Sequence, residues 1–576
     1  MNRTSDRGVH RNVFALISVL LLARMSLGVD IVGEWEFRFS VGEWEMTANA
    51  AFTKGADGAY SGKWTPVWPE DMQTDEMAFN PDDFKITLSN IKFDGQKLSF
   101  VQRVSMPEWE SESTFAGTLQ DGRLAGTFSG EFGDFDATAT PIASGAQSDQ
   151  PRFWSWAQKP PMGWNSWDCF GPTVTEAEVK NNADYMAEHL KSHGWEYVVV
   201  DIRWFVENTK AGGYNQRDPR YVMDEYGRFT PAVNRFPSAA DGKGFKPLAD
   251  YVHGKGLKFG IHLMRGIPVG AVEKNTPILG SDARAADIYS RRQQCRWLRD
   301  MYTIVADRPG AQEYYNSIFK LYASWEVDYV KIDDLSRPYH ADEIELIRKA
   351  IDGCGRPIVL SMSPGATPLE SAEHAVNHAN LWRISDDFWD RWQDIEEMFG
   401  RCKNWAPYSA PGHWPDADML PLGRISIRGE RGPDRRTRFT KDEQITLMTL
   451  WSIFRSPLMF GGDLPSNDEF TLSLLTNDEV LAVNQTCTNS RELSNADGLI
   501  VWAADILDSQ DKYVALFNTR DGAEAVSVWV ALDALGLDGR CNVRDLWAKK
   551  DLGETAENFS ASVSSHGAGM YRIGPK

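Results

Sequence analysis

Alternating apolar and polar residues characterise the first quarter of the chain. Runs in which every second residue is apolar occur at 33–39, 85–88, 97–101 and 123–128. This period of two is typical of strands with one buried face, and Asp94-Gly95 and Asp121-Gly122 provide tight turns between the runs. Residues 30–142 are therefore predicted to form an all-β accessory module, either a small meander barrel or a sandwich.

Near-continuous apolar runs follow from about residue 156 and alternate with helical patterns. The apolar runs lie at 197–200, 257–261, 328–332, 357–360 and 457–460. Helical patterns lie between them at 176–192, 311–325 and 341–351. This alternation predicts a (β/α)8 TIM barrel over residues 156–475. A doubly wound sheet is the alternative, but no glycine-rich phosphate loop follows the first strand.

Strand-like alternation returns near the C-terminus. It is clearest at 499–503, 513–517, 525–530 and 569–573. Residues 478–576 are predicted to form an antiparallel β-sandwich, and the small polar residues within 143–155 a linker. A chain of 576 residues is too long for one hydrophobic core, so a multidomain protein with an all-β module, a barrel and a sandwich is expected.

The N-terminal residues have the pattern of an export signal. Three arginines accompany an apolar run at 13–23, which is too short to span a bilayer. Ser26-Leu27-Gly28 then supplies small residues suited to cleavage. We therefore expect residues 1–28 to be a cleaved signal peptide and the protein to be secreted or periplasmic. No later segment has the length and hydropathy of a transmembrane helix.

Composition narrows the possible partners. A net charge of -20 argues against nucleic acid, because phosphates require a basic surface. The 22 tryptophans suit the apolar faces of sugar rings, although core packing is the commoner role of any single one. The six cysteines lack the spacing of a zinc site, and the sequence alone does not fix a disulfide pairing. We expect no metal and no cofactor.

Charged and polar residues follow the predicted barrel strands. They are Asp201, His262, Lys331, Asp333, Ser361, Ser363, Arg383, Asp387, Asp416 and Asp418. Since the C-terminal ends of barrel strands meet at one mouth, these side chains are expected to share a pocket. Buried carboxylates are costly unless they are paired or used, and two of them suggest an acid and a nucleophile for glycosidic cleavage. Helix capping or a solvated loop is the alternative for any single Asp.

Strand periodicity distinguishes the two acids of Lys331-Ile332-Asp333-Asp334. Lys331 and Asp333 lie two residues apart and can both point into the mouth, whereas Asp334 points away. The ammonium of Lys331 favours an ionised Asp333, which a nucleophile requires.

Five ordered blocks in this region carry a family resemblance. They are residues 161–167, 197–201, 328–333, 382–387 and 411–420. Together they resemble glycoside hydrolase family 27, the α-galactosidases and α-N-acetylgalactosaminidases, from about Lys159 to the C-terminus. The resemblance implies a retaining hydrolase without a cofactor that releases terminal α-galactosyl residues from an oligosaccharide or glycoside.

The resemblance also implies residue roles. It makes Asp333 the nucleophile and Asp387, rather than Asp386, the acid/base of a double displacement through a covalent glycosyl-enzyme. The substrate-binding residues that it implies are Trp167, Asp201, His262, Lys331, Ser363, Arg383 and Asp418.

Departures from the family pattern leave the sugar open. Ile202 follows Asp201 where galactose-specific members have a second acid, and His262 stands where a tyrosine is usual. Residues 266–302 form an insertion, and the Ser and Ala of 361–366 resemble the roomier N-acetylgalactosaminidase loop. α-N-Acetylgalactosaminidase, an isomaltose-releasing α-glucan hydrolase and β-L-arabinopyranosidase remain alternatives. A carbohydrate-binding protein on an inactive barrel is the alternative outside enzymes.

Overall fold

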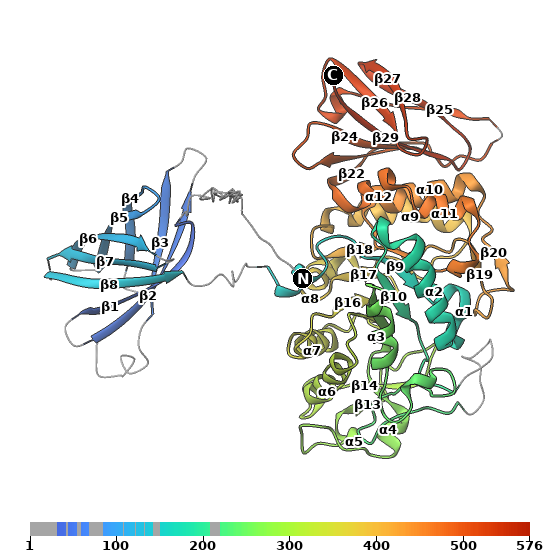
Figure 1. Cartoon of the computed structure of the whole chain (residues 1–576), viewed down its shortest axis with the longest axis horizontal. Coiled ribbons are helices and arrows are strands. Elements are labelled where there is room, and N and C mark those ends of the chain that lie inside the picture. The colour runs from blue at the N-terminus through green and yellow to red at the C-terminus, as the bar shows by residue number, and fades with distance from the viewer. Residues whose placement is uncertain are drawn as a thin grey trace, which may run out of the picture. The chain divides into compact units, whose positions relative to one another are not determined.

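The computed structural model describes residues 31–41, 44–54, 59–67, 85–106, 109–120, 123–131, 133–141, 150–207, 219–363, 365–522 and 524–576. The predicted signal peptide, 1–28, and residues 143–149 of the predicted linker lie outside these ranges. The chain divides into two compact units, Met1–Asp149 and Gln150–Lys576, which are described separately (Figure 1).

The described part of the first unit contains eight antiparallel strands. They are β1 (Gly33–Val41), β2 (Trp44–Lys54), β3 (Tyr60–Val67), β4 (Lys85–Phe93), β5 (Lys97–Met106), β6 (Trp109–Gln120), β7 (Arg123–Gly130) and β8 (Gly133–Pro141). Their order, β3-β2-β1-β8-β7-β6-β5-β4, is that of a meander whose first and last strands pair. A Cβ on Gly62 of β3 would lie 3.0 Å from Ile91 of β4, so the two edge strands also approach each other.

Aromatic side chains fill this first unit. Phe37 and Trp64 have ring centroids 4.9 Å apart, and Phe100 and Phe115 are stacked at 5.0 Å. All four are buried, as is Phe128 beside them. Apolar and polar residues therefore alternate along these strands because every second residue points into the apolar interior. The all-β prediction is confirmed.

Eight parallel strands form the barrel of the second unit. They are β9 (Met162–Asn165), β10 (Tyr197–Val200), β11 (Lys258–Met264), β15 (Tyr329–Asp333), β16 (Val359–Met362), β17 (Leu381–Arg383), β18 (Trp414–Asp416) and β21 (Leu458–Phe460). β21 pairs with β9, and a parallel bridge between Leu420 and Phe460 joins the end of the β18 segment to β21. The strands thus close on themselves, and the predicted TIM barrel is confirmed.

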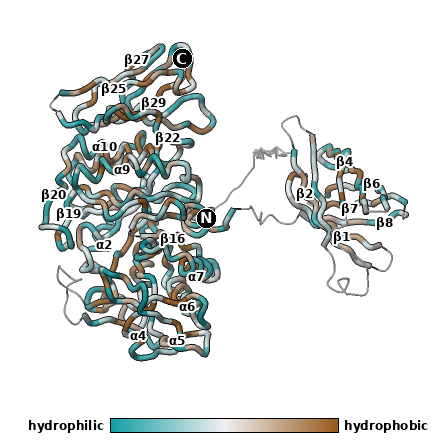
Figure 2. The backbone as a smooth tube through the Cα atoms, turned by 180° about the vertical axis from the view of Figure 1, so that it is seen from behind, coloured by the Kyte–Doolittle hydropathy of each residue, from teal (hydrophilic) through white to brown (hydrophobic). Residues whose placement is uncertain are grey.

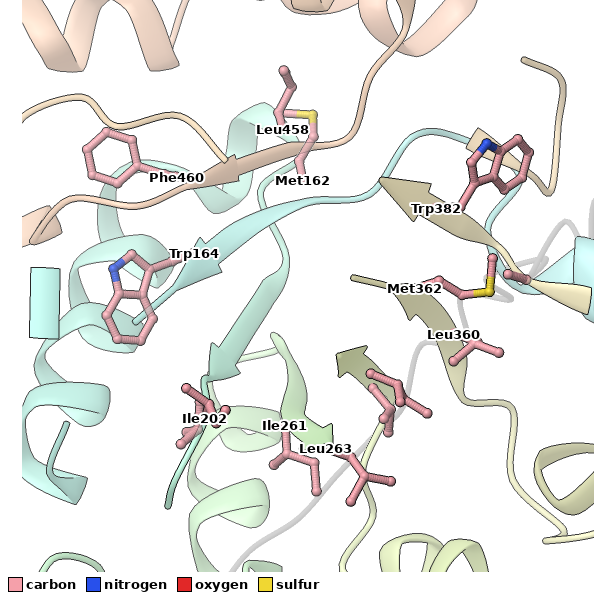
Figure 3. Packing of buried hydrophobic residues seen from close by; sticks show 14 of the residues in the cluster. Met162, Trp164, Ile202, Ile261, Leu263, Leu360, Met362, Trp382, Leu458 and Phe460 are labelled. Atoms are coloured by element: carbon pink, nitrogen blue, oxygen red, sulfur yellow. The ribbon is translucent and has the colours of Figure 1, made fainter. Parts of the chain in front are cut away.

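Successive strand residues face opposite layers of the barrel. Tyr197 and Val199 belong to the interior cluster with Tyr329 and Trp414, whereas Val198 and Val200 pack in the layer under the helices. Figure 3 shows part of that outer layer, where side chains of neighbouring strands such as β9 and β21 lie close together. Strands buried on both faces explain the near-continuous apolar runs of the sequence.

Helices surround the strands. The longer ones are α2 (Glu176–His189), α3 (Lys246–Gly254), α6 (Ala311–Ser324), α7 (Ala341–Asp352), α8 (Ala372–His378), α9 (Trp392–Trp405), α10 (Lys441–Phe454), α11 (Glu469–Leu475) and α12 (Asp478–Thr486). A short α1 (Trp167–Phe170) follows β9 directly. α7 is amphipathic and buries Ile344, Ile347 and Ile351 at helical spacing. Among the described residues, no helix has the length and hydropathy needed to cross a membrane.

The insertion after β11 folds into a small substructure. It contains β12 (Ile267–Pro268), α4 (Val269–Glu273), α5 (Ala285–Ile288), β13 (Tyr289–Ser290) and β14 (Met301–Ile304). The three strands pair in the order β12-β14-β13. Arg265 ties this substructure to the barrel, because it donates to the carbonyl of Gln293 and pairs with Asp334 and Glu343.

The C-terminal strands form a sandwich. One sheet has the order β22 (Cys487–Ala496), β23 (Leu499–Ile506), β24 (Lys512–Asn518), β29 (Ala568–Pro575), β26 (Arg540–Asp545) and β27 (Lys550–Ala556). β25 (Val526–Ala531) and β28 (Asn558–Val563) form the other, with Leu516 and Val528 in the shared core. The predicted C-terminal β-sandwich is confirmed. Short β19 (Arg424–Ile425) and β20 (Arg435–Arg436) pair in the loop after β18.

The sandwich and the barrel belong to one compact unit. The apolar helix α10, buried along nearly its whole length, lies between them (Figure 2). Thr446 of α10 donates a hydrogen bond to the His566 carbonyl, and Trp547 donates one to Thr449. All six cysteines lie in the described part of the chain, and none of them forms a disulfide.

Candidate active site

A cavity of about 820 Å³ opens at the C-terminal ends of the barrel strands. Of the residues predicted to take part in catalysis or binding, it is lined by Trp167, Asp201, Lys331, Asp333, Ser363 and Asp387. An adjoining small recess shares Trp167, Lys331 and Asp387 with the cavity and adds Arg383 and Asp418. Eight of the nine predicted residues therefore lie around one continuous site.

Asp333 is the last residue of β15 and is 5% exposed. Its Oδ2 lies 2.9 Å from Nε2 of His262, although the ring N–H is not aligned as a hydrogen bond. Its Oδ1 has no hydrogen-bond partner among the described residues. A carboxylate oxygen without a competing donor is suited to attack on carbon, because it need not break a bond first.

His262 is the one predicted residue outside the lining of the cavity and the recess. It lies on β11, is completely buried and contacts Asp333, and its carbonyl accepts a hydrogen bond from Trp204. The expected contact of His262 with the sugar therefore stays a prediction. The register of β11 places His262 opposite Lys331, two residues before Asp333 at the end of β15. From this position His262 can orient Asp333.

Asp201 and Lys331 form a buried ion pair beside Asp333. Nζ of Lys331 donates to Oδ2 of Asp201 at 3.0 Å, and the Asn165 amide donates to the same oxygen at 2.8 Å. Burial raises the pKa of Asp201, but Lys331, His262 and the hydrogen bonds outweigh it and bring the pKa down to about 2. Burial lowers the pKa of Lys331, and Asp201, Asp333 and Asp418 raise it well above its usual range. Both groups are therefore charged at neutral pH.

The segment after Asp201 shows what stands in place of a second acid. Ile202 is 1% exposed and packs in the apolar core, while its N–H donates to Oδ1 of Asp201. Arg203, at a left-handed φ of 68°, turns away to a bidentate pair with Asp300 at 2.9 Å. Tyr221 also donates to Asp300. This end of the cavity thus offers one carboxylate, and each of its oxygens already accepts a hydrogen bond.

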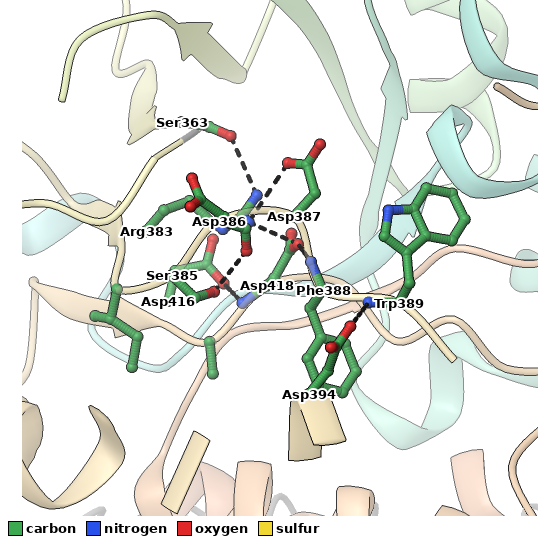
Figure 4. Close-up of polar contacts among 12 residues, drawn as sticks. Ser363, Arg383, Ser385, Asp386, Asp387, Phe388, Trp389, Asp394, Asp416 and Asp418 are labelled. Carbon is green, nitrogen blue, oxygen red and sulfur yellow. Dashed lines mark hydrogen bonds and ion pairs between the residues drawn. The ribbon is translucent and has the colours of Figure 1, made fainter. Parts of the chain in front are cut away.

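Arg383 connects the acids on the other side of the site (Figure 4). Its Nη2 lies 2.7 Å from Oδ2 of Asp418 and 3.6 Å from Oδ1 of Asp387, and its Nη1 donates to Ser363 at 3.4 Å. Asp387 is the more accessible member, with 39% of its side chain exposed. The neighbouring Asp386 pairs with Arg337 instead. An accessible carboxyl beside a buried guanidinium is placed to exchange protons with a ligand.

Asp418 is the most perturbed of the predicted residues that are acids. Burial raises its pKa to about 7, the carboxylates of Asp387 and Asp416 add to this effect, and Arg383 and Lys331 oppose it. Its Oδ2 accepts a hydrogen bond from the N–H of Phe388 at 2.7 Å, which fixes the chain next to Asp387.

Asp168 is a member of the site that the sequence analysis missed. It is 2% exposed, lines the recess beside Asp418, and its Oδ2 has no hydrogen-bond partner among the described residues. Burial and the charge of Asp418 raise its pKa well above the usual range. Its position at the start of α1 looks like that of an ordinary helix-capping acid, so no sequence signal marked it.

The outer wall of the cavity was also missed. It contains Trp297, Trp389 and the five arginines Arg337, Arg391, Arg431, Arg435 and Arg438. The four closely spaced arginines of 431–438 were the available sequence signal. Two clusters that could hold a metal ion, Glu345 with His374 and His378 and Asp250 with His253 and Glu326, contain no residue of the cavity lining.

The raised pKa of Asp418 predicts a pH-dependent stability. Because the folded state holds the proton more tightly than the ordinary pKa of 3.8 would, this contribution is complete below about pH 4 and is lost as the pH rises through about 7. We expect the free energy of unfolding of the wild type, minus that of Asp418→Asn, to fall across this window by up to about 1.4 kcal/mol per pH unit. Denaturant unfolding at each pH measures it, and a pH-independent difference would contradict the assignment.

Comparison with known proteins gives the same picture as the geometry. A family model described as alpha galactosidase A matches residues 159–271 and 278–486, and one described as the alpha galactosidase C-terminal beta sandwich domain matches 496–573. Alpha-galactosidase 2 of Arabidopsis thaliana is 29% identical over 76% of this chain and 94% of its own. Alpha-galactosidase A of Cellvibrio japonicus is 28% identical over 75% of this chain and 95% of its own.

A solved structure is more similar. A GH27 β-L-arabinopyranosidase from Geobacillus stearothermophilus, in complex with arabinose, is 52% identical, covers 74% of this chain and 99% of its own, and has a TM-score of 0.72. The match of the family model over more than half of the chain, on a barrel that gathers two candidate catalytic acids in one cavity, leads to one conclusion: the chain belongs to glycoside hydrolase family 27, the α-galactosidase family.

Proposed function

We propose that the protein is an exported, retaining exo-glycosidase whose preferred substrates are β-L-arabinopyranosides. The observation that carries the choice of sugar is the single acid at the end of β10, where buried Ile202 follows Asp201. The 52% identity to a β-L-arabinopyranosidase supports it. The apolar run near the N-terminus supports export.

The two candidate sugars differ at one position. A β-L-arabinopyranoside has the ring hydroxyls of an α-D-galactopyranoside but lacks the exocyclic CH2OH group. A pocket for galactose gains affinity by accepting a hydrogen bond from that extra hydroxyl, and a polar group left without a partner costs binding energy. Here Ile202 supplies no acceptor, so Asp201, which already accepts hydrogen bonds from Asn165, Ile202 and Lys331, is the single carboxylate at this end for the hydroxyls of the sugar. The sugar without the extra hydroxyl therefore loses nothing in this site.

The mechanism assigns one carboxyl to each face of the sugar. Asp333 attacks the anomeric carbon as the glycosidic bond breaks, while Asp387 gives its proton to the departing oxygen. The covalent glycosyl-enzyme is then hydrolysed by a water molecule that Asp387 deprotonates. Lys331 and Asp201 border the same part of the cavity and would bind ring hydroxyls, with Trp167 packing against the ring. Arg383 and Asp418 hold Asp387 through their shared ion-pair network.

α-Galactosidase is the second candidate, because the curated relatives named above carry that activity in their names at 28–29% identity. Ser363 and Ala366 in the loop after β16 favour α-N-acetylgalactosaminidase activity as a further candidate. α-Glucan hydrolysis is a candidate only because the family includes enzymes with that activity.

Nitrophenyl glycosides test the proposed function directly. We expect hydrolysis of the β-L-arabinopyranoside with a kcat/KM at least about tenfold above that of the α-galactoside, the equivalent of one hydrogen bond that the site does not make. The α-N-acetylgalactosaminide and α-glucoside should be cleaved more slowly still. Faster cleavage of any of these three would replace the proposed substrate, and no cleavage of any would favour an inactive barrel.

Removing each carboxyl separates the two catalytic roles. Asp333→Ala should abolish hydrolysis of every aryl glycoside, because no other group can form the glycosyl-enzyme. Asp387→Ala should lower kcat/KM by about 100-fold or more for a phenyl glycoside, but far less for a dinitrophenyl glycoside, whose leaving group needs no proton. Equal losses on both substrates would argue against Asp387 as the acid. Asp386→Ala is the matched control and should retain the wild-type ratio.

Ile202→Asp tests the choice of sugar. The new carboxylate offers an acceptor at the end of β10, so the ratio of kcat/KM for the α-galactoside to that for the β-L-arabinopyranoside should rise by about tenfold or more. The ratio is measured within one variant, so a partly destabilised protein does not distort it. Ile202→Leu keeps the site apolar and should leave the ratio unchanged. An unchanged ratio in a folded Ile202→Asp protein would contradict the role of this position.

A further inference from the structure

The cavity is larger than its sugar-binding end requires. Its volume of about 820 Å³ is typical of pockets for ligands much larger than one pentose. The inner end holds the residues already assigned to the sugar. The outer part is lined by residues with no role so far, including Trp297, which is 44% exposed, and Trp389.

The chemistry of Asp387 fixes what the outer part binds. An acid that protonates the departing oxygen stands between the sugar and the leaving group. The residues that follow Asp387 in the chain, Trp389, Asp390 and Arg391, continue along the outer wall. This wall therefore borders the leaving group, and its side chains decide which aglycone the enzyme accepts.

Asp390 holds two arginines in this wall. Its carboxylate is completely buried and accepts hydrogen bonds from Nε and Nη2 of Arg435 at 3.0 and 2.6 Å. It also accepts one from Nη1 of Arg438 at 3.3 Å. Nη1 of Arg435 is occupied by Ser426 and by carbonyl oxygens, whereas the Arg438 side chain is 56% exposed and has donors to spare. One carboxylate thus balances two guanidinium groups, which leaves one positive charge in excess.

Further positive charge lies next to this pair. Arg431 is exposed, and among the described residues its guanidinium has no ion-pair or hydrogen-bond partner. Arg391 pairs with Asp394 through Nε and Nη2, so its Nη1 remains available. The outer wall holds five arginines against three acids, Asp386, Asp390 and Glu430, and Asp394 behind the wall balances Arg391, so one positive charge remains in excess in a protein whose net charge is -20. A local reversal of charge in a cavity selects anionic ligands.

We propose that the outer part of this cavity is a leaving-group subsite for an anionic sugar, held by Arg431, Arg438 and Arg391. Guanidinium groups bind planar carboxylates through paired N–H donors and bind sulfate in the same way, so the ligand is a uronic acid or a sulfated sugar. Trp389 and Trp297 supply apolar surface for its ring. The inference rests on the proposed hydrolase activity and deepens it, because it names the partner to which the cleaved sugar is joined.

A matched pair of substrates tests this subsite. The 4-carboxyphenyl glycoside of the preferred sugar is compared with the neutral 4-carbamoylphenyl glycoside. A second arm compares the 4-sulfophenyl glycoside, whose sulfonate stands in for a sulfate ester, with the neutral 4-sulfamoylphenyl glycoside. We expect the wild type to prefer each anionic member by about fivefold in kcat/KM at low salt, with the preference shrinking as salt screens the exposed arginines. A preference for the anionic member in only one of the two pairs also supports the proposal, and it shows whether the ligand is a uronic acid or a sulfated sugar.

The double variant Arg431→Gln/Arg438→Gln should lose most of the anionic preference and its salt dependence. The preference is the ratio of kcat/KM for the anionic substrate to that for the neutral one, measured with the same protein. A substitution that changes activity on both substrates equally therefore leaves this ratio unchanged. Arg436→Gln is the matched control, because Arg436 lies in the same loop, pairs with Asp468 and does not line the cavity. It should keep the wild-type preference.

Two outcomes would overturn the inference, and both can be distinguished from the outcome that would overturn the proposed hydrolase function. An active wild type with no anionic preference in either arm, or a double variant that keeps the preference, refutes the subsite and leaves the hydrolase intact. Absence of turnover on every substrate refutes the hydrolase. Calorimetric titration with the non-hydrolysable thioglycosides of the same pairs then decides the subsite independently, since equal affinity for both members excludes it.

Discussion

The cost of burying charge at the mouth of the barrel governs the arrangement of the whole site. Asp201, Asp333, Arg383 and Asp418 are each no more than 6% exposed, so none can rely on water for solvation. Lys331 compensates the charge of Asp201, and Arg383 pairs with Asp418, each at hydrogen-bond distance, whereas Oδ1 of Asp333 has no hydrogen-bond partner among the described residues. The same compensation fixes the side chains in space, and fixed charges are what a glycosidase needs around a developing positive charge.

Packing below the site keeps these charges at the mouth. Tyr197, Tyr329 and Trp414 fill the barrel interior, and all three are almost inaccessible. These bulky aromatic rings occupy the space below the strand ends, and the charged residues of the site lie above them. The sandwich supports the barrel from outside through α10, whose Trp451 donates a hydrogen bond to the carbonyl of Asp418. Stability of the fold and geometry of the site thus share residues.

Charge is distributed unevenly along the cavity. The inner end has three acids, Asp201, Asp333 and Asp387, around one lysine, whereas the outer wall has more arginines than acids. An inner acidic end suits a sugar that becomes positively charged in the transition state. Ile202 packs in the apolar core behind Asp201 at the inner end, and the arginines near Asp390 line the outer wall, so different residues border the two parts of the cavity.

The sequence by itself determined the three-part fold, because the period of apolar residues is imposed by whether one face or both faces of a strand are buried. It also marked the strand ends, whose charged residues lie around the cavity. Only the tertiary structure decided that His262 contacts Asp333 instead of lining the cavity, that Asp168 joins the recess, and that arginines from a distant loop form the outer wall. The register between strands and the path of long loops place these residues, and neither leaves a local pattern in the chain.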